Sequence, residues 1–281
     1  MASKNIKSKK IKINDISIAY HIKYAKNEDN VILFLHGFPF NKSIWKNQLD
    51  SLNDNTTGIA VDIRGHGLTT SGHGFFSIDV FAKDILSFID SLGYDKVILC
   101  GVSMGGYIAL KCYEIEPHRI SALVLSDTHH KSDDNVAKQK RFDSIQAILR
   151  YGRRPFAIAF LENLFSKKTI QSNQTSIDII KTSIRRNSIR SICSTQLALA
   201  SRTDSTHVLS EIKVPTLLIR GKEDKLTSFE LMNEMHQKIK NSIFKQIDHT
   251  GHLPNLESTD EFNMILNDFI SNIHQKKSND C

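Results

Sequence analysis

The feature that most constrains this chain is the pentapeptide Gly101–Gly105, with the sequence GVSMG, which lies between an apolar run and a helix-like run. The apolar run at 96–100 predicts a buried strand, and the run at 106–113 predicts a helix. A serine at such a sharp strand-to-helix turn needs a strained backbone, and the glycines two residues to either side remove side chains that would clash there. The hydroxyl of Ser103 would project at a helix N-terminus, where the positive end of the helix dipole favours an anion formed during acyl transfer. The pattern therefore indicates a nucleophilic serine.

The order of predicted elements indicates the fold class. Strands that are apolar throughout and alternate with helices are typical of a parallel sheet covered on both faces, so we expect a doubly wound α/β core. The expected strands are Ile11–Tyr24 as one alternating strand, Val31–His36, Gly58–Asp62, Lys96–Cys100, Ala122–Ser126, Val214–Ile219 and, more weakly, Ser242–Ile247, with helices at Ile78–Ser91 and Glu261–Ile273.

The middle of the chain has a different pattern. From Thr128 to about Ser205 there is no clear strand, and apolar residues recur at helical spacing. We expect a helical cap at 128–205 inserted into a core formed by 1–127 and 206–281. From Thr128 to Ser210 there are 14 Lys and Arg against 6 Asp and Glu, so this segment accounts for the net charge of +7 of the whole chain. The charge fits a solvated helical surface or a lid that attracts an anion, and no nucleic-acid motif accompanies it.

Length and composition narrow the class of protein further. With 281 residues, of which 40% are hydrophobic and 24% charged, the chain can bury a sizeable core. No run approaches the roughly 20 apolar residues that span a bilayer, and no signal-peptide core follows the basic N-terminus, so we expect a soluble, cytoplasmic protein without membrane association. Cys100, Cys112, Cys193 and Cys281 lack zinc-site spacing, which predicts no metal and a reducing compartment.

A serine nucleophile needs a general base and an orienting carboxylate, and the sequence offers both downstream. Asp224 follows the predicted strand at Val214–Ile219, at the carboxyl edge where parallel sheets place their sites. His252 lies in a loop between the last strand and the last helix. The chain order Ser103, Asp224, His252 agrees with the order that serine hydrolases of this topology use.

Further residues compete for these roles. Asp127 also follows a strand and is a second candidate for the acid, although a turn or capping role is expected of it. His249 is a second candidate for the base, and Glu223 would point away from the site. The histidines at 129, 130 and 207 are expected to be solvated.

An oxyanion hole needs two backbone N–H groups. One should come from Met104, directly after the nucleophile, and the second from Phe38 in the loop His36-Gly37-Phe38-Pro39. The side chains of Phe38 and Met104 would then line an apolar substrate pocket.

Together these motifs resemble the α/β-hydrolase superfamily over nearly the whole chain. The resemblance rests on His36–Pro39, Asp62–Gly67, Gly101–Gly106, Gly221–Asp224 and Gly251-His252. It implies a core sheet of about eight strands with a helical cap after the sixth, and acyl transfer without a metal or organic cofactor. It also implies that Arg64 and His66 belong to a structural turn. Serine at 103 is unlike the dehalogenase branch, where aspartate is expected.

For the substrate, we expect a carboxylic ester. A narrower hypothesis is that the cap resembles the basic surface of carboxylesterases that demethylate pimeloyl groups on acyl carrier protein, through Lys138, Lys140, Arg141, Arg150, Arg153 and Arg154. Enol-lactonase, C–C hydrolase, thioesterase and cofactor-free haloperoxidase or perhydrolase activities share the same triad. The alternative without enzyme activity is a ligand-binding receptor on the same fold.

Overall fold

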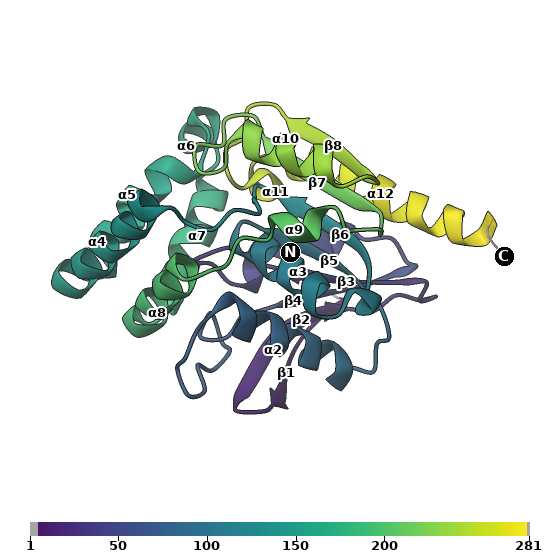
Figure 1. The fold of residues 1–281 in the computed structure, drawn as a ribbon, viewed down its shortest axis with the longest axis horizontal. Coiled ribbons are helices and arrows are strands. Elements are labelled where there is room, and N and C mark those ends of the chain that lie inside the picture. Colours follow the sequence, from purple (N-terminus) through teal and green to yellow (C-terminus); the bar gives the residue numbers. More distant parts are fainter. Residues whose placement is uncertain (1–4, 280–281) are drawn as a thin grey trace.

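The computed structural model describes residues 5–279, with side chains described through Ile273. Its centre is an eight-stranded sheet with the order β1-β2-β4-β3-β5-β6-β7-β8 (Figure 1). Strand β1 pairs antiparallel with β2, β2 pairs antiparallel with β4, and every other pairing is parallel. The predicted mostly parallel sheet is thus confirmed. The strands are β1 Ile6–Ile13, β2 Ile16–Lys23, β3 Asn30–Leu35, β4 Thr56–Val61, β5 Val97–Val102, β6 Ile120–Ser126, β7 Thr216–Gly221 and β8 Ser242–Ile247.

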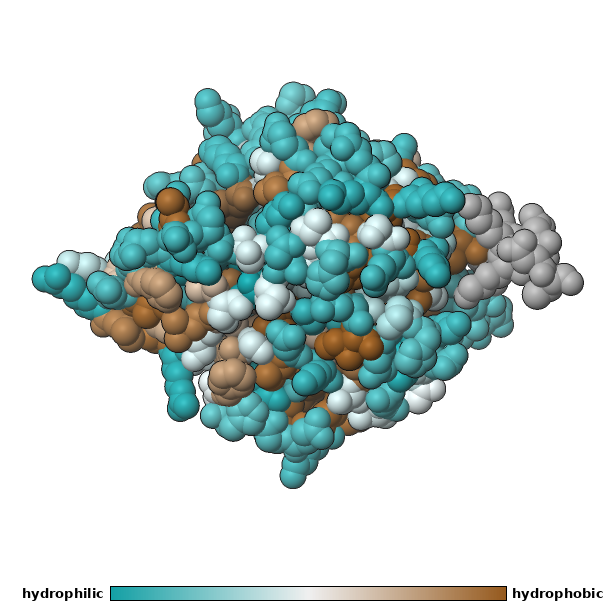
Figure 2. Space-filling view, in the orientation of Figure 1, coloured by the Kyte–Doolittle hydropathy of each residue, from teal (hydrophilic) through white to brown (hydrophobic). Residues whose placement is uncertain are grey.

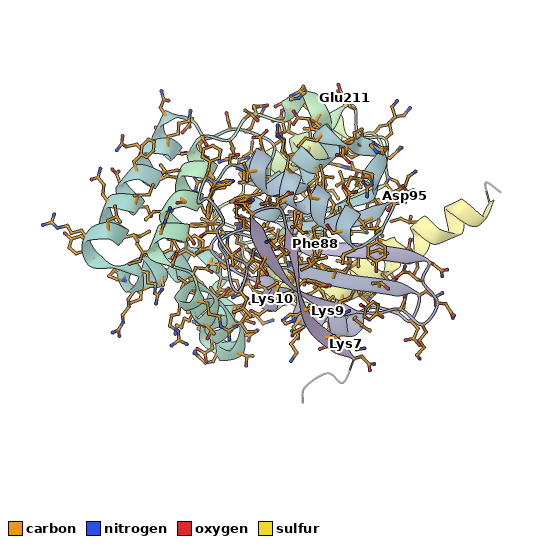
Figure 3. The ribbon with its side chains drawn as sticks, turned by 90° about the horizontal axis from the view of Figure 1, so that it is seen from below. Lys7, Lys9, Lys10, Phe88, Asp95 and Glu211 are labelled. Atoms are coloured by element: carbon orange, nitrogen blue, oxygen red, sulfur yellow. The ribbon has the colours of Figure 1, made fainter. Side chains whose placement is uncertain are left out.

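The first strand prediction was wrong in its bounds. The segment expected as one strand at Ile11–Tyr24 is part of a hairpin, in which Ile13 pairs with Ile16 across a tight turn. Asn14 has a φ of 51°, a left-handed conformation that asparagine tolerates in turns. The hairpin leaves β1 at the edge of the sheet, where Lys7, Lys9 and Lys10 (Figure 3) discourage pairing with another strand.

The central strands are buried on both faces. Every residue of β3, β4, β5 and β7 is buried, as expected for parallel strands covered by helices. Helix α2 (Ile78–Ser91) packs on α3 (Met104–Ile115), and α1 (Lys46–Ser51) packs on α12 (Thr259–Asn279). The remaining core helices are α9 Thr206–Leu209, α10 Phe229–Lys238 and α11 Pro254–Glu257, with 3-10 turns at Lys42–Trp45 and Pro117–Arg119.

Six helices lie between β6 and β7, and the first five of them form the left side of the molecule in Figure 1. These five are α4 Asn135–Tyr151, α5 Arg153–Leu164, α6 Lys167–Ser172, α7 Gln174–Arg186 and α8 Ile189–Ala200. The side chain of Asp134 caps α4 by accepting from the N–H of Ala137, and Ser188 caps α8 in the same way. We call residues 128–205 the helical insertion; its role as a separate cap stays a prediction. Over the described residues, no helix is both long and apolar enough to cross a membrane.

Candidate active site

Ser103 stands at the junction of β5 and α3 in a strained conformation. Its φ of 55° and ψ of −119° lie in a region that non-glycine residues rarely adopt. A Cβ on Gly105 would lie 2.1 Å from the carbonyl oxygen of Leu35, and one on Gly101 would lie 2.3 Å from the carbonyl carbon of Gly105. The two glycines therefore allow β3, β5 and α3 to approach closely enough to hold this turn.

The loop expected to complete the oxyanion hole lies against the same turn. A Cβ on Gly37 would lie 3.1 Å from the Cβ of Ser103, which puts the 36–39 loop in contact with the candidate nucleophile. Met104 is the first residue of α3, and the N–H groups of a first helical turn have no partner within the helix. The side chains of Phe38 and Met104 are buried, and both line a cavity that also contains Ser103.

The candidate base and acid form a buried pair. Nδ1 of His252 lies 2.9 Å from Oδ2 of Asp224, and both side chains are almost fully buried. Oδ1 of Asp224 accepts hydrogen bonds from the N–H groups of Leu226 and Thr227 at 2.8 and 3.2 Å. Burial acts to raise the pKa of Asp224, but the neighbouring His252 and these N–H groups hold the pKa below its usual value. The carboxylate therefore stays ionised, which favours a proton on Nδ1 of His252 and leaves Nε2 as the basic nitrogen.

The cavity that joins these groups has a volume of about 290 Å³. Ser103 and His252 both line it, together with Phe38 and Met104. The structure thus brings four of the five predicted site residues to one cavity, and Asp224 lies directly behind His252.

Asp127, the second candidate for the acid, lies next to the site. Its Oδ1 accepts from the N–H of Gly221 at 2.8 Å, and the Ser126 hydroxyl donates to its Oδ2 at 2.7 Å. Burial and the adjacent charge of Asp224 raise the pKa of Asp127 well above the usual range for a carboxyl. The pKa of Asp127 is thus shifted in the opposite direction to that of Asp224, and Asp224 is the carboxylate that accepts the hydrogen bond from Nδ1 of His252.

Glu223 and His249 lie apart from the cavity. The side chain of His249 is 72% exposed, and its Nδ1 lies 3.8 Å from a carboxylate oxygen of Glu223. This pair lies at the surface, so neither residue has the buried, oriented setting of His252.

Asp127, Asp224 and His252 offer atoms within 4.8 Å of one another, close enough for a metal ion. Their arrangement fits hydrogen bonding better. Both carboxylates already accept backbone N–H groups, and His252 points its Nδ1 at Asp224. We assign no metal to this group.

Sequence reasoning missed a carboxylate that holds the histidine loop. Glu257 of α11 accepts from the N–H groups of Gly251 and Leu253 at 2.9 and 3.2 Å, on either side of His252. Its other oxygen accepts from the N–H of Ser166 in the helical insertion at 2.8 Å. Glu257 is a positioning residue that ties the His252 loop to the insertion. Its place just after the His252 loop was a signal that could have identified it.

The expectation that His129 and His130 are solvated was wrong. His130 is buried, and His129 lines the cavity with its Nε2 3.0 Å from the hydroxyl of Tyr107. Burial, and then the charge of Arg202, lower the pKa of His129 to about 3, so the ring is neutral.

Four of the six cationic residues predicted as one surface are spread over three hollows of the insertion, and Lys140 and Arg150 line none of these hollows. Arg141 lines the cavity of Ser103, Lys138 lines an apolar hollow beside Phe142, and Arg153 and Arg154 line a third hollow between α5 and α7. Docking of an acyl carrier protein here stays a prediction.

The fold and the Ser103 turn define a class of protein, the α/β hydrolases. The chain belongs to the alpha/beta hydrolase fold family, whose model matches residues 30–259. It is similar to 3-oxoadipate enol-lactonase 2 of Acinetobacter baylyi, at 24% identity over 89% of this chain and 91% of that protein. The known homologues of this chain include an enol-lactonase, an esterase and a lipase, all hydrolases.

Solved structures resemble the chain over nearly its full length. A thermophilic esterase from Thermogutta terrifontis, with malate bound, superposes with a TM-score of 0.89 and 27% identity over 95% of this chain and 99% of that one. The enol-lactonase of Burkholderia xenovorans has a TM-score of 0.87 at 22% identity over 94% of this chain and 100% of that one, which supports the fold.

Proposed function

We propose that this protein hydrolyses carboxylic esters through an acyl-enzyme on Ser103. The observation that carries the proposal is the buried His252–Asp224 pair, with 2.9 Å between Nδ1 and Oδ2, in the same cavity wall as a strained serine at the N-terminus of α3. Such a pair activates a serine because the carboxylate fixes the tautomer of the imidazole and stabilises its protonated form.

The chemistry follows from these positions. Nε2 of His252 takes the hydroxyl proton of Ser103 as the oxygen attacks the ester carbonyl carbon. The carbonyl oxygen becomes negatively charged, and the N–H groups of Phe38 and Met104 donate hydrogen bonds to it. The ester C–O bond then breaks, and His252 gives its proton to the departing alcohol. A water molecule attacks the acyl group, returns a proton to His252 and then to Ser103, and the carboxylic acid leaves.

Lactone hydrolysis is a second candidate. It uses the same steps, except that the leaving alcohol stays attached to the acid. Two observations favour it: the similarity to the enol-lactonase of Acinetobacter baylyi, and a charged side of the cavity that could hold a small polar ring.

The test is hydrolysis of p-nitrophenyl esters from acetate to decanoate by the wild type and by Ser103→Ala. We expect turnover by the wild type and a loss of about 10⁴- to 10⁶-fold in kcat for the variant, as for other triad nucleophiles. The chain length with the highest kcat/KM reports the depth of the cavity. Ser210→Ala, at an exposed serine, is the matched control and should retain full activity.

Two outcomes would contradict the proposal. Equal turnover by the wild type and Ser103→Ala would place the reaction elsewhere. No turnover of any ester or lactone by a folded wild type that still binds these compounds would favour a receptor.

A further inference from the structure

The cavity of Ser103 has a mixed lining. Phe38, Phe160, Leu199 and Leu226 contribute apolar side chains. Asp133 and Arg141, from the loop after β6 and the first half of α4, contribute a charged wall. The mechanism proposed above uses neither of these two charged residues.

The guanidinium of Arg141 is held by two partners. Its Nε donates to Oδ2 of Asp133, and Nη2 lies 3.4 Å from Oδ1 of the same carboxylate. Its Nη1 donates to Oε1 of Gln196 of α8 at 3.0 Å. Because a guanidinium carries five N–H donors, these contacts leave one donor on Nη1 and one on Nη2. Arg141 is thus oriented by the protein and keeps two donors at its outer end.

A second guanidinium shares the same carboxylate. Nη1 of Arg202 lies 2.5 Å from Oδ1 of Asp133, and the Arg202 guanidinium lies 4.5 Å from the ring centre of Tyr107. The side chains of Asp133 and Arg202 are 5% and 3% exposed, so both charges are withdrawn from water. One negative charge therefore faces two positive charges.

Among the residues that the structure describes at this wall, none supplies the missing negative charge. His129 is neutral near pH 7, and the Tyr107 hydroxyl is kept protonated because burial raises its pKa. Asp224 directs its carboxylate at His252 and at the N–H groups of Leu226 and Thr227, and it forms no ion pair with Arg141 or Arg202. Buried or half-buried charges are costly unless they are paired, so an anion is the group that best completes this wall.

We infer that Arg141 forms a binding subsite for an anionic group, a carboxylate, on the ester or lactone that Ser103 attacks. This inference rests on the proposed function and names its substrate class: short esters or lactones that carry a second, ionised carboxyl group. Two parallel N–H donors of a guanidinium match the two oxygens of a carboxylate. The cavity of about 290 Å³ limits the part of the substrate between the ester or lactone group and the carboxylate to a few carbons.

Paired substrates of equal length test the subsite. On the acyl side, mono(p-nitrophenyl) glutarate is compared with p-nitrophenyl pentanoate, and on the alcohol side, 4-acetoxybutanoate with butyl acetate. We expect the wild type to prefer the charged member of at least one pair in kcat/KM. In Arg141→Met that preference should fall about tenfold to hundredfold, the usual effect of hydrogen bonds to a charged group. Arg141→Lys, which keeps the charge without the paired donors, should be intermediate.

Arg150→Met is the matched control, because Arg150 lies on the same helix but is exposed and outside the cavity. Arg150→Met should leave unchanged the ratio of kcat/KM for the charged substrate to kcat/KM for the neutral one. Thermal unfolding of each variant shows whether α4 is still folded. A wild type with no preference in either pair, or a preference that survives in Arg141→Met, would overturn the subsite.

A binding measurement separates this inference from the proposed reaction. Calorimetry of Ser103→Ala with monomethyl glutarate and with methyl pentanoate needs no turnover. Tighter binding of the anion, lost when Arg141→Met is added, supports the subsite even if no ester is hydrolysed. Equal binding of the two esters would overturn it even if Ser103 proves to be the nucleophile.

Discussion

Strand β5 and helix α4 both position residues that line the cavity, Ser103 and Arg141, but they are packed very differently. All six residues of β5 are buried, and the strand ends directly at Ser103. Of the 17 residues of α4, which carries Arg141, only Ile148 is buried. Close packing fixes the position of the reacting groups, whereas α4 is held mainly by polar contacts. On the function proposed above, the contrast predicts that the core holds the reacting groups and that the insertion selects the substrate.

The surface shows the same contrast. Apolar side chains gather on the insertion side of the molecule in Figure 2, where Phe142 of α4 and Leu197 of α8 are 41% and 50% exposed. Helix α4, with a single buried residue, has the features of a segment that opens with little free energy, whereas α7 and α8 of the same insertion each bury several apolar side chains. We therefore expect the core and the insertion to respond differently to substitution, to urea and to pH.

The largest effect is expected at Asp224, the proposed acid of the triad. Asp224→Asn should lower kcat by about 10⁴-fold, because an amide cannot hold the imidazole of His252 in the reactive tautomer. Asp127→Asn should lower kcat by no more than severalfold, because Asp224 is the carboxylate that accepts from His252 and an amide oxygen at 127 can still accept from the N–H of Gly221. The measurement is ester hydrolysis by both variants at saturating substrate. A loss at Asp127→Asn as large as that at Asp224→Asn would show that Asp127 is the acid.

Much of this site was predictable because its signals are local. The strained serine needs glycines at 101 and 105, and both are visible in a pentapeptide. Asp224 and His252 follow strands whose apolar runs are clear, so their position at one edge of the sheet follows from the parallel topology.

The rest depends on contacts that no local pattern encodes. The Asp133–Arg141–Arg202 cluster joins residues almost 70 positions apart in a segment where helices pack through polar side chains. The hairpin at Asn14 was missed because apolar alternation continues on both sides of a two-residue turn. His129 was assigned to solvent because a histidine after a strand carries no sign of the helices that later cover it.

The difference in packing predicts different costs for removing an apolar side chain. Phe34 of β3 is fully buried, with its ring centre 5.1 Å from that of Trp45, and Phe34→Ala should lower the free energy of unfolding by about 3–5 kcal/mol. Leu149 of α4 is 67% exposed, and Leu149→Ala should change the free energy of unfolding by less than about 0.5 kcal/mol. Urea unfolding measures both. Equal costs would show that α4 packs against a surface that covers Leu149 in solution.

Acid should destabilise the core more than the insertion. His36 and His66 are fully buried in the core with ring centres 5.1 Å apart. Burial lowers the pKa of His36 to about 3, with a further contribution from His66, and burial lowers the pKa of His66 to about 4. In the unfolded chain both rings take up a proton below about pH 6.5, but in the folded chain they stay neutral. Between these pH values the unfolded state binds more protons, so stability is complete above about pH 6.5 and decreases as the pH falls towards 4 and then 3.

Each such histidine should lower the free energy of unfolding by about 1.4 kcal/mol at pH 5.5 relative to pH 7.5. The core pair should therefore lower it by about 3 kcal/mol. His129, with a pKa of about 3, adds a similar amount from the cavity wall. Urea unfolding at the two pH values measures the whole decrease for the wild type, and His129→Gln should reduce that decrease by about 1.4 kcal/mol. If His129→Gln removed most of it, the insertion would control acid stability and the contrast with the core would be reversed. An unchanged free energy of unfolding in the wild type would mean that the buried rings take up protons without unfolding.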